Sequence, residues 1–338
     1  MRLADEIVVL DTGSTDETVA KLKKLGVKVA QKIHPEFRFD IARNESLSLV
    51  PHDTDICVCT DLDEVFEGDW RTKIERAWSG GTTLCRYRYI WSHIGDKSGV
   101  EFYANKIHAY GAYRWIYPVH EVLEFDSEYP LKEKTLTLTD LVLHHYPDQT
   151  KSRASYLPLL ELCAVENPNC DRTAHYLGRE YYFHRRYDDA IAWLKRHLGL
   201  KNATWLDERV ASMRIIAKCY EQKGEFALAE RWYLKAVSQD VNSREAWVEY
   251  QTFLYNRGDY DGVIYAGVRA ISIKNKNLSY ITDPIAWGER AYDLLSIAYY
   301  NVGDYENAVK YGTIAHEISP TARIWANLKL YKKAFLSV

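Results

Sequence analysis

The sequence lacks the marks of several large classes of protein. Its 338 residues contain no apolar run of about 18 residues, and the N-terminus, MRLADEIVVL, has no charged start followed by a long apolar stretch. We therefore expect no transmembrane segment and no secretory leader, and a cytoplasmic location. The formal net charge is only −3, which gives no reason to expect nucleic acid or an anionic membrane as a partner.

Cysteine and glycine motifs are also missing. The six cysteines have neither the spacing of metal ligands nor that of a disulfide framework. Cys57 and Cys59 lie on a predicted strand, where both side chains point to the same face and pack in the core. No G-x-G-x-x-G follows a predicted strand, which disfavours a nicotinamide-dependent oxidoreductase. The chain is nevertheless long enough for two domains, each with its own core.

The second half of the chain, from Ala174 onward, is repetitive. The segments RRYDDAI, GEFALAE, GDYDGVI and GDYENAV align on one turn position. That position is held by Arg185, Gly224, Gly258 and Gly303. The step from Gly224 to Gly258 is 34 residues, the period of the tetratricopeptide repeat, and the two longer steps indicate insertions.

Each repeat carries mostly small residues where its two helices are expected to cross. Seven residues before the turn position the copies have Gly178, Ala217, Gln251 and Ser296, and five residues after it they have Ala190, Ala229, Val263 and Ala308. Gln251 is the exception, so we expect the third copy to pack more loosely or to turn this side chain outward. The four copies resemble tetratricopeptide repeats and predict an all-α repeat domain over residues 151–338.

Residues 1–150 have a different pattern. The β-rich runs EIVVL, DICVCT, TTLCRYRYIW and KTLTLTDLVLHH are separated by short helical patterns. Strands alternate with helices early and follow one another later, which predicts an α/β sheet completed by an antiparallel part. A helix is predicted over DETVAKLKKLG, with Gly26 as its stop. The segment PDQTKSRASYLP is the expected domain boundary.

The junction between the first strand and this helix, VVLDTGSTDET, carries polar residues of two kinds. Ser14 and Glu17 match a capping box, and Asp16 in the first turn suits the helix dipole. Capping leaves Asp11 unexplained, because it stands at the carboxyl end of an apolar strand, where open α/β sheets bind ligands. Its carboxylate can accept hydrogen bonds from a base or a ribose, and Gly13 lets the backbone approach such a ligand.

A second acidic group follows another strand, in DICVCTDLDEV. Asp61 and Asp63 are separated by one residue, with Glu64 beside them, and can aim oxygen ligands at one divalent cation that bridges a diphosphate. A solvated acidic turn is the ordinary explanation of an isolated D-x-D. Between the two junctions, Arg43 suits phosphate oxygens and Asn44 suits ribose or sugar hydroxyls. Pairing of Arg43 with a surface carboxylate is the simpler alternative.

Together, VVLDTGSTDET, FRFDIARNESL and CTDLDE resemble the family 2 glycosyltransferases, whose fold is the GT-A nucleotide-diphospho-sugar transferase fold. The resemblance covers residues 1–150 and implies an inverting hexosyltransferase that uses Mn²⁺ or Mg²⁺ and a nucleotide-sugar, with a UDP-sugar favoured. It implies a nucleotide-binding set of Asp11, Gly13, Ser14, Asp16, Arg43, Asn44 and Asp61. It assigns the metal to Asp63 and Asp61.

The resemblance extends to RWIYPVHEVL and LVLHHYP, which makes Trp115 a candidate site residue. An inverting transfer needs a general base to deprotonate the acceptor. Glu121 is the candidate for that base, and His120 is the alternative for the base or for metal binding. His144 and His145 are candidate metal ligands beside the two aspartates, although a partly buried histidine pair is the plainer explanation.

The family pattern begins one strand earlier than this sequence, so the first family strand is expected to be missing, either because the N-terminus is truncated or mis-called or because the protein has lost part of its donor site. The leading hypothesis is a metal-dependent glycosyltransferase whose repeats hold a polypeptide or an envelope-glycan acceptor. The alternative is a catalytically inactive transferase-like protein that acts as a repeat-based protein-binding module. A phosphatase with Asp11 as its nucleophile would leave the D-x-D unexplained. Homo-oligomer formation through the repeats stays open.

Overall fold

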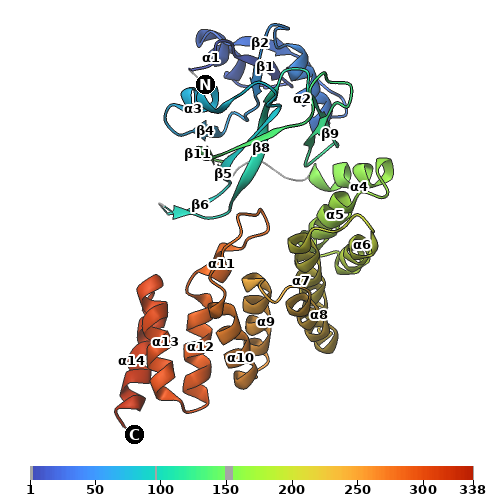
Figure 1. The fold of residues 1–338 in the computed structure, drawn as a ribbon. Coiled ribbons are helices and arrows are strands. Elements are labelled where there is room, and N and C mark those ends of the chain that lie inside the picture. The colour runs from blue at the N-terminus through green and yellow to red at the C-terminus, as the bar shows by residue number, and fades with distance from the viewer. Residues whose placement is uncertain (1–2, 96, 149–154, 338) are drawn as a thin grey trace. The chain divides into compact units, whose positions relative to one another are not determined.

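A computed structural model describes residues 3–95, 97–148 and 155–337 (Figure 1). The chain divides into two compact units, Met1–Glu166 and Asn167–Val338. Half of the boundary segment expected from the sequence, PDQTKSRASYLP, lies outside the described residues. Each unit has its own core and is described by itself.

The first unit begins with two parallel strands joined by a helix. β1 (Val8–Asp11) and β2 (Lys28–Gln31) pair in parallel, and α1 (Thr18–Lys24) connects them. Among the described residues, these two strands form a sheet of their own beside the main sheet. The next helix, α2 (Phe39–Ser48), packs against β1. The sequence prediction of an early strand–helix alternation is confirmed.

The start of α1 differs from the sequence prediction. The N-cap residue is Glu17, and the first-turn amide of Thr18 donates to Asp16 Oδ1 at 2.9 Å. Ser14 lies further upstream, where its own backbone N–H donates to the carboxylate of Asp11. The predicted capping box of Ser14 and Glu17 is therefore wrong, because Asp11 already organises the turn that contains Ser14. The predicted stop is confirmed, because helix α1 ends just before the left-handed Gly26.

The main sheet of the first unit has five strands in the order β3–β8–β5–β11–β4 (Figure 1). The strands are β3 (Ile56–Val58), β4 (Glu64–Phe66), β5 (Leu84–Ile90), β8 (Glu101–Ala109) and β11 (Thr135–His145). β5 and β11 pair in parallel, and the other neighbours are antiparallel. This mixed order agrees with the α/β sheet and antiparallel completion that the sequence predicts.

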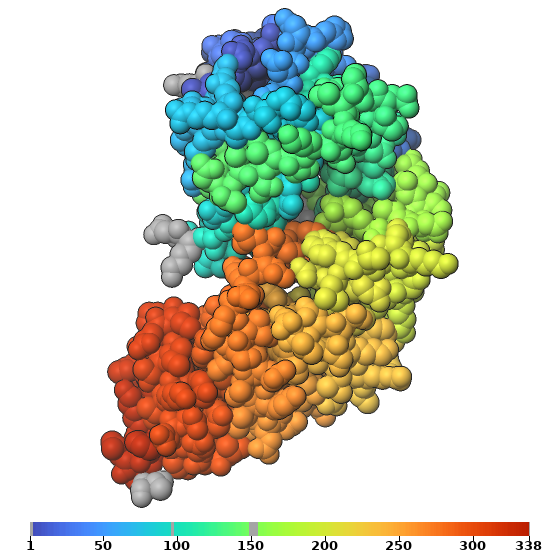
Figure 2. Space-filling model, viewed as in Figure 1, coloured from blue at the N-terminus to red at the C-terminus, as the bar shows by residue number. Residues whose placement is uncertain are grey.

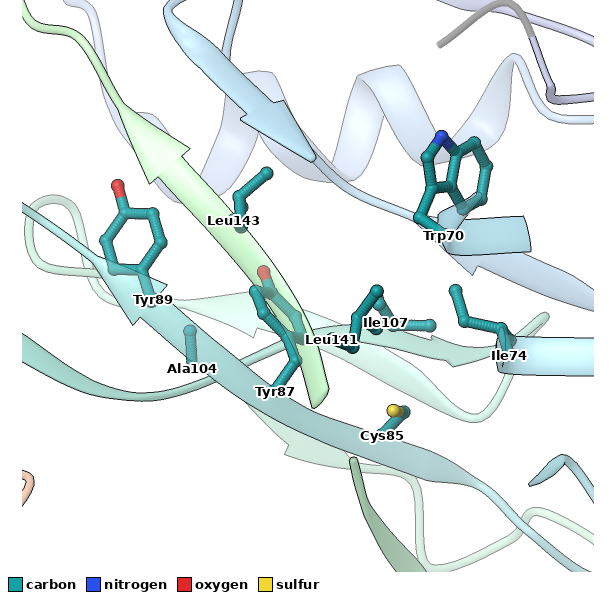
Figure 3. Packing of buried hydrophobic residues seen from close by; sticks show 9 residues of the cluster. All are labelled: Trp70, Ile74, Cys85, Tyr87, Tyr89, Ala104, Ile107, Leu141 and Leu143. Atoms are coloured by element: carbon teal, nitrogen blue, oxygen red, sulfur yellow. The ribbon is translucent and has the colours of Figure 1, made fainter. Parts of the chain in front are cut away.

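The core of this unit lies on one face of the main sheet, under α3 (Trp70–Ala77). Tyr87, Ile107 and Leu143 come from three neighbouring strands, and Trp70 and Ile74 come from the helix (Figure 3). All five side chains are buried. Strands with buried aromatic and branched residues therefore hold the ends of β3, β4, β5 and β11 in place, and the candidate site lies at those ends.

β11 changes register in its middle. Leu138 pairs with Tyr87 of β5, and Val142, four residues further along β11, pairs with Arg88, the very next residue of β5. The extra residues of the irregularity are therefore in β11. Before this irregularity, the even-numbered Leu138 packs against the core, and after it the odd-numbered Leu141 and Leu143 do. Because side chains alternate along a strand, the odd-numbered His145 continues the core face, and its neighbour in the sequence points to the opposite face.

Three shorter segments complete the first unit. β9 (Tyr113–Ile116) and β10 (Val122–Phe125) form an antiparallel pair, and α2 packs against β9 as well as β1. β6 (His93–Ile94) and β7 (Lys97–Ser98) form a small hairpin. The last helix of the unit is α4 (Tyr156–Glu166).

The second unit is all-α and consists of helix pairs, which confirms the tetratricopeptide-like prediction. The helices are α5 (Asp171–Phe183), α6 (Tyr187–Gly199), α7 (Leu206–Gln222), α8 (Phe226–Gln239), α9 (Arg244–Asn256), α10 (Tyr260–Ser272), α11 (Pro284–Trp287), α12 (Arg290–Asn301), α13 (Tyr305–Ile318) and α14 (Ala322–Phe335). Consecutive pairs pack directly on one another. In the space-filling view the segments of this unit follow one another in sequence order from yellow to red (Figure 2). α11 and the segment before it account for the longest step between repeats. Within the described residues, no helix combines the length and the apolar character that crossing a bilayer would require.

The helix crossings explain the small residues. At Gly178, a Cβ atom would lie 2.6 Å from Cγ of Leu194 on the partner helix. Gln251, at the equivalent position of the third repeat, is fully buried, and its Nε2 donates to the carbonyl of Ala291 at 3.1 Å. The expectation that Gln251 turns outward is wrong, because Gly267 stands in the partner helix where the first repeat has Leu194. The large and the small residue have exchanged helices.

Candidate donor and metal site

The turn after β1 is organised by the carboxylate of Asp11. This buried side chain accepts the backbone N–H groups of Gly13 at 3.4 Å and Ser14 at 3.3 Å, and the side-chain amide of Gln31 at 3.3 Å. Hydrogen bonding with Ser14 lowers the pKa of Asp11, so the carboxylate is ionised at neutral pH. Gly13 has φ +124°, which only glycine adopts readily. Asp11 thus fixes an exposed turn that also contains Asp16.

Asp61, the first aspartate of the D-x-D, belongs to an ionic network. Its carboxylate lies 3.0 Å from Arg43 of α2 and 3.1 Å from Lys106 of β8. Lys106 also contacts Glu64 at 2.6 Å, and Glu64 accepts the hydroxyl of Tyr89 at 2.7 Å. Burial by itself would raise the pKa of Asp61, but the charges of Lys106 and Arg43 outweigh it and lower the pKa to about 2. Asp61 is therefore ionised and held by two cations.

The sequence analysis missed Lys106 and Tyr89. Lys106 follows an exposed residue in β8 and precedes the fully buried Ile107, and its ammonium reaches the network from the sheet. A lysine in the interior of a strand, directly before an isoleucine, is costly to bury without a partner, and that was the available signal. Tyr89 looked like any aromatic residue of a buried strand.

Arg43 connects the D-x-D to the turn after β9. Its Nε donates to Glu121 Oε1 at 2.5 Å, and its guanidinium lies 4.9 Å from the ring centre of Trp115. Trp115 is 4% exposed, and its Nε1 is a buried donor that has no hydrogen-bond acceptor among the described residues. His120 has a left-handed φ of +52°, and its ring contacts that of Tyr156 edge to face. Of the two candidate bases, Glu121 joins the ionic network.

Asn44 ties α2 to β9. Its Nδ2 donates to the carbonyl of Trp115 at 2.8 Å, and its Oδ1 accepts the backbone N–H of Trp115, also at 2.8 Å. Both polar atoms of the amide are thus used inside the protein. A contact from Asn44 to a nucleotide, as the sequence predicts, would have to share or replace one of these bonds.

Asp63, the second aspartate of the D-x-D, lies beside His145 at the end of β11. His145 Nε2 is 3.5 Å from Asp63 Oδ2, and its Nδ1 is 3.1 Å from the carbonyl of Trp91. A hydrogen bond from Nδ1–H to that carbonyl leaves Nε2 as the nitrogen with the lone pair. A carboxylate and an imidazole that converge in this way suit manganese, and the carboxylate also suits magnesium. The donor set of Asp63 and His145 therefore fits a divalent ion.

His144 lies on the opposite face of β11. Its Nδ1 is 3.0 Å from His93 Nε2, and its Nε2 is 2.5 Å from Glu67 Oε1. The rings of His93, His144 and Tyr146 are stacked. The structure thus brings His145 to the D-x-D and directs both ring nitrogens of His144 elsewhere. In the described ranges, no three His, Cys, Asp or Glu side chains gather as a complete metal-binding group.

The comparison with known families decides the nature of the first unit. The profile of glycosyl transferase family 2 matches residues 2–115. The first unit carries a family 2 glycosyltransferase domain. The match spans the Asp11 turn, Arg43 and the D-x-D, and Glu121 and His145 lie beyond it.

Among curated proteins, the glucosyl-3-phosphoglycerate synthase of Petrotoga mobilis is similar to part of this chain. The two are 46% identical over 65 residues, which make up 18% of this chain and 20% of that protein. The chain thus spans about a fifth of the length of this curated relative. The similarity supports a glycosyltransferase in general.

Solved structures resemble the helical part. The C-terminal part of a tetratricopeptide repeat-containing protein from Cytophaga hutchinsonii is 19% identical, with a TM-score of 0.44, over 54% of this chain and 66% of that one. MamA is 22% identical, with a TM-score of 0.40, over 52% of this chain and 96% of that one. The repeat assignment rests on the helix pairs themselves.

Proposed function

We propose that the glycosyltransferase domain transfers a hexose from a nucleotide diphospho-sugar to an acceptor, with inversion and with the help of Mn²⁺ or Mg²⁺. The observation that carries the proposal is the approach of Asp63 and His145 to 3.5 Å at the strand ends that also hold Asp61. A lone acidic turn would need no imidazole beside it. The family 2 match makes a nucleotide-sugar the natural donor, and we favour a UDP-sugar.

The nucleotide side of the site is proposed to be the turn after β1, with Asp11, Gly13, Ser14 and Asp16. Asp11 fixes the backbone of this turn through its hydrogen bonds to Gly13 and Ser14. The residues from 12 to 17 are exposed, so a base or a ribose can reach them. Asp11 is buried and ionised, and it can accept a further hydrogen bond from the ligand.

Asp63 and His145 would hold the metal ion, and Asp61 would stay between Arg43 and Lys106. A bound divalent ion would offset the charge of the leaving diphosphate. Arg43 can contribute to the same effect from the protein side, because a guanidinium matches diphosphate oxygens. Lys106 has a positioning role in this arrangement, since it holds Asp61 and Glu64 together.

Glu121 is the general base in our proposal. Arg43 binds its Oε1, which orients the carboxylate and leaves Oε2 to accept the proton of the acceptor. His120, the alternative base, precedes Glu121 in the same turn and has a left-handed backbone conformation. The repeat unit would hold the acceptor, and stacked helix pairs favour a polypeptide over an envelope glycan.

The first test is a thermal-shift titration with UDP- and GDP-sugars, with and without Mn²⁺. A ligand that binds only the folded protein raises the melting temperature. We expect a shift that requires Mn²⁺ and that is lost in Asp63→Asn and in His145→Gln. His144→Gln is the matched control, because His144 faces away from Asp63, and it should keep the shift.

The opposite outcome would favour the alternative function. If no donor shifts the melting temperature of the wild-type chain under any metal condition, the domain does not bind nucleotide-sugars, and a repeat-based binding module becomes the better description. If His144→Gln loses the shift and His145→Gln keeps it, the metal assignment is wrong although the donor binds.

A further inference from the structure

The connection between α10 and α12 is longer than the other connections of the repeat unit. The step from Gly258 to Gly303 is 45 residues, whereas the step from Gly224 to Gly258 is 34. The added length is an irregular stretch, 273–283, followed by the short α11 (orange in Figure 1). Residues 240–243 alone are enough to join α8 to α9. Joining two helices therefore does not account for the insertion.

Both ends of the insertion are held by one residue of α9. Arg244, which is buried at the start of that helix, donates from Nε to the carbonyl of Ala286 at 2.7 Å and from Nη1 to the carbonyl of Ile273 at 3.4 Å. Its guanidinium also lies 4.8 Å from the ring centre of Trp287. The entry and the exit of the insertion thus meet at α9, and residues 274–283 form a loop that goes out and returns.

The loop reaches back to the first two repeats with Tyr280. The ring centre of Tyr280 lies 5.6 Å from that of Tyr176 of α5, with the planes 13° apart, and 5.5 Å from that of Trp205, just before α7. The hydroxyl of Tyr280 donates to Glu208 of α7. A backbone hydrogen bond of 3.0 Å across residues 279–282 forms a turn at the tip of the loop. Two rings and a carboxylate thus form a pocket for one tyrosine.

Between its two ends the loop has fewer anchors. Residues 274–278 are exposed. Under the loop lies a cleft of about 400 Å³ with a mostly polar lining, which includes Asp207 of α7 and Asn277 and Thr282 of the loop. Such a cleft lacks the dense apolar contacts of a protein core. Withdrawal of Tyr280 would therefore release the loop without opening the core of the repeats.

The loop crosses the first helices of three consecutive pairs. α5 contacts α7, and α7 contacts α9, so these helices form a row. In helical repeat proteins such a row is a surface on which an extended polypeptide can lie. We propose that residues 274–283 are an intramolecular strap that keeps this surface closed, with Tyr280 in the place that a tyrosine of a partner polypeptide would take. The proposal concerns the repeat unit alone and goes beyond the proposed sugar transfer.

The strap sets a threshold for binding, because it is part of the same chain. A segment tethered by a short flexible linker acts at an effective concentration on the order of millimolar. A partner at a lower concentration has to bind the pocket more tightly than the strap does. The partner also has to carry an unmodified tyrosine, because the carboxylate of Glu208 accepts the hydroxyl of Tyr280 and would repel a phosphate in its place.

The test uses a fluorescein-labelled peptide with the strap sequence, NKNLSYITDP, and the full chain, followed by fluorescence anisotropy. Tyr280→Ala leaves the pocket open, so we expect it to bind the peptide at least about tenfold more tightly than the wild-type chain. Tyr280→Phe, which keeps the ring and loses the hydroxyl, should lie between the two. Adding Trp205→Ala to Tyr280→Ala should abolish the gain, because one wall of the pocket is lost. The phosphotyrosine form of the peptide should bind none of these proteins.

Leu278→Ala is the matched control, because the exposed Leu278 belongs to the strap and lies outside the tyrosine pocket, and it should bind the peptide like the wild-type chain. Equal binding by the wild-type chain and Tyr280→Ala, or no binding by either, would overturn the proposal. No sugar donor is present, so these results do not depend on the transferase proposal.

Hydrogen exchange distinguishes a strap from a structural brace. In Tyr280→Ala we expect faster exchange in residues 274–283, with α5 and α7 as protected as in the wild-type chain. Loss of protection in α5 and α7 would show instead that the insertion holds the repeats together, and the strap proposal would then be wrong.

Discussion

Asn44 shows how one side chain can join two elements of the glycosyltransferase domain. Its amide makes both backbone hydrogen bonds of Trp115 that face α2, in the way a neighbouring strand would. Trp115 in turn lies under the guanidinium of Arg43, which binds Asp61 and Glu121. The position of the ionic network therefore depends on a neutral residue beside it.

Replacing Asn44 by alanine should lower the stability of the first unit. The backbone N–H and C=O of the buried Trp115 would lose their partners, at a cost of about 1–3 kcal/mol each when no water replaces them. The measurement is the free energy of unfolding from urea titration, with Asn105→Ala as the control, because the exposed Asn105 should change it by less than about 0.5 kcal/mol. A variant that keeps full stability but no longer responds to nucleotide-sugars would show instead that Asn44 contacts the donor.

For individual residues, the sequence indicates which side chains belong to the candidate site better than it indicates which residues they contact. It pairs Asp61 and Asp63 in one role, whereas in the structure Asp61 is held by Arg43 and Lys106, and Asp63 faces His145. These partners come from α2, β8 and β11, far apart in the chain. Spacing within a motif cannot reveal contacts of that kind, so Lys106 was missed altogether.

At each helix crossing of the second unit, the packing depends on the combined size of two side chains, one from each helix. The first repeat combines Gly178 with Leu194, and the third combines Gln251 with Gly267, so the total volume at the crossing is kept. The sequence analysis compared the position five residues after the turn and not the one nine residues after it, where Leu194 and Gly267 stand, and it therefore expected looser packing or an outward-facing Gln251. Comparing both positions of a crossing would have predicted its burial.

The close crossing of α5 and α6 makes Gly178 sensitive to a single methyl group. Gly178→Ala places Cβ 2.6 Å from Cγ and 3.2 Å from the backbone nitrogen of Leu194, so the helices must move apart. We expect a loss of about 1–3 kcal/mol in the free energy of unfolding. The control is Gly199→Ala, since no heavy atom lies within 4 Å of that Cβ. Equal stability of the two variants would mean that the crossing is looser than the structure shows.

For the molecule as a whole, the sequence was sufficient to predict a family 2 glycosyltransferase domain followed by tetratricopeptide-like helices. Motifs with fixed spacing and a 34-residue period can be recognised in the linear sequence. The division of the main sheet from the β1–β2 pair is not such a pattern, because it depends on which strands find each other in space. Strand order was therefore beyond the sequence analysis.

Overall stability should depend on pH through a buried polar chain in the repeat unit. His175 Nδ1 lies 2.8 Å from the hydroxyl of Ser212, which lies 2.9 Å from Nδ1 of His197, and His197 faces Glu208. Burial lowers the pKa of His175 to about 3. For Glu208, burial would raise the pKa, but His197 and its other partners lower it to about 2. Both groups bind protons more readily in the unfolded chain.

The melting temperature of the repeat unit should therefore decrease as the pH falls. His175 contributes to this decrease between about pH 6.5 and pH 3. Glu208 contributes between about pH 4.5 and pH 2. Each group contributes up to about 1.4 kcal/mol per pH unit within its range. His175→Gln should flatten the profile between pH 7 and pH 5, as followed by far-ultraviolet circular dichroism. His184→Gln, at an exposed position of the same unit, should not flatten it. An unchanged profile in His175→Gln would assign the dependence to other groups.

The register change in β11 affects how the site responds when evolution inserts or deletes a residue near the two adjacent histidines, His144 and His145. The irregularity between Leu138 and Val142 decides whether an odd-numbered or an even-numbered residue faces Asp63 at the end of the strand. Gain of one residue before the strand end would move His144 into the position of His145 and would still present an imidazole to Asp63, whereas loss of one residue would move Tyr146 there. Two adjacent histidines thus make this position of the site tolerant of a single-residue insertion, which would remove a lone histidine from the site.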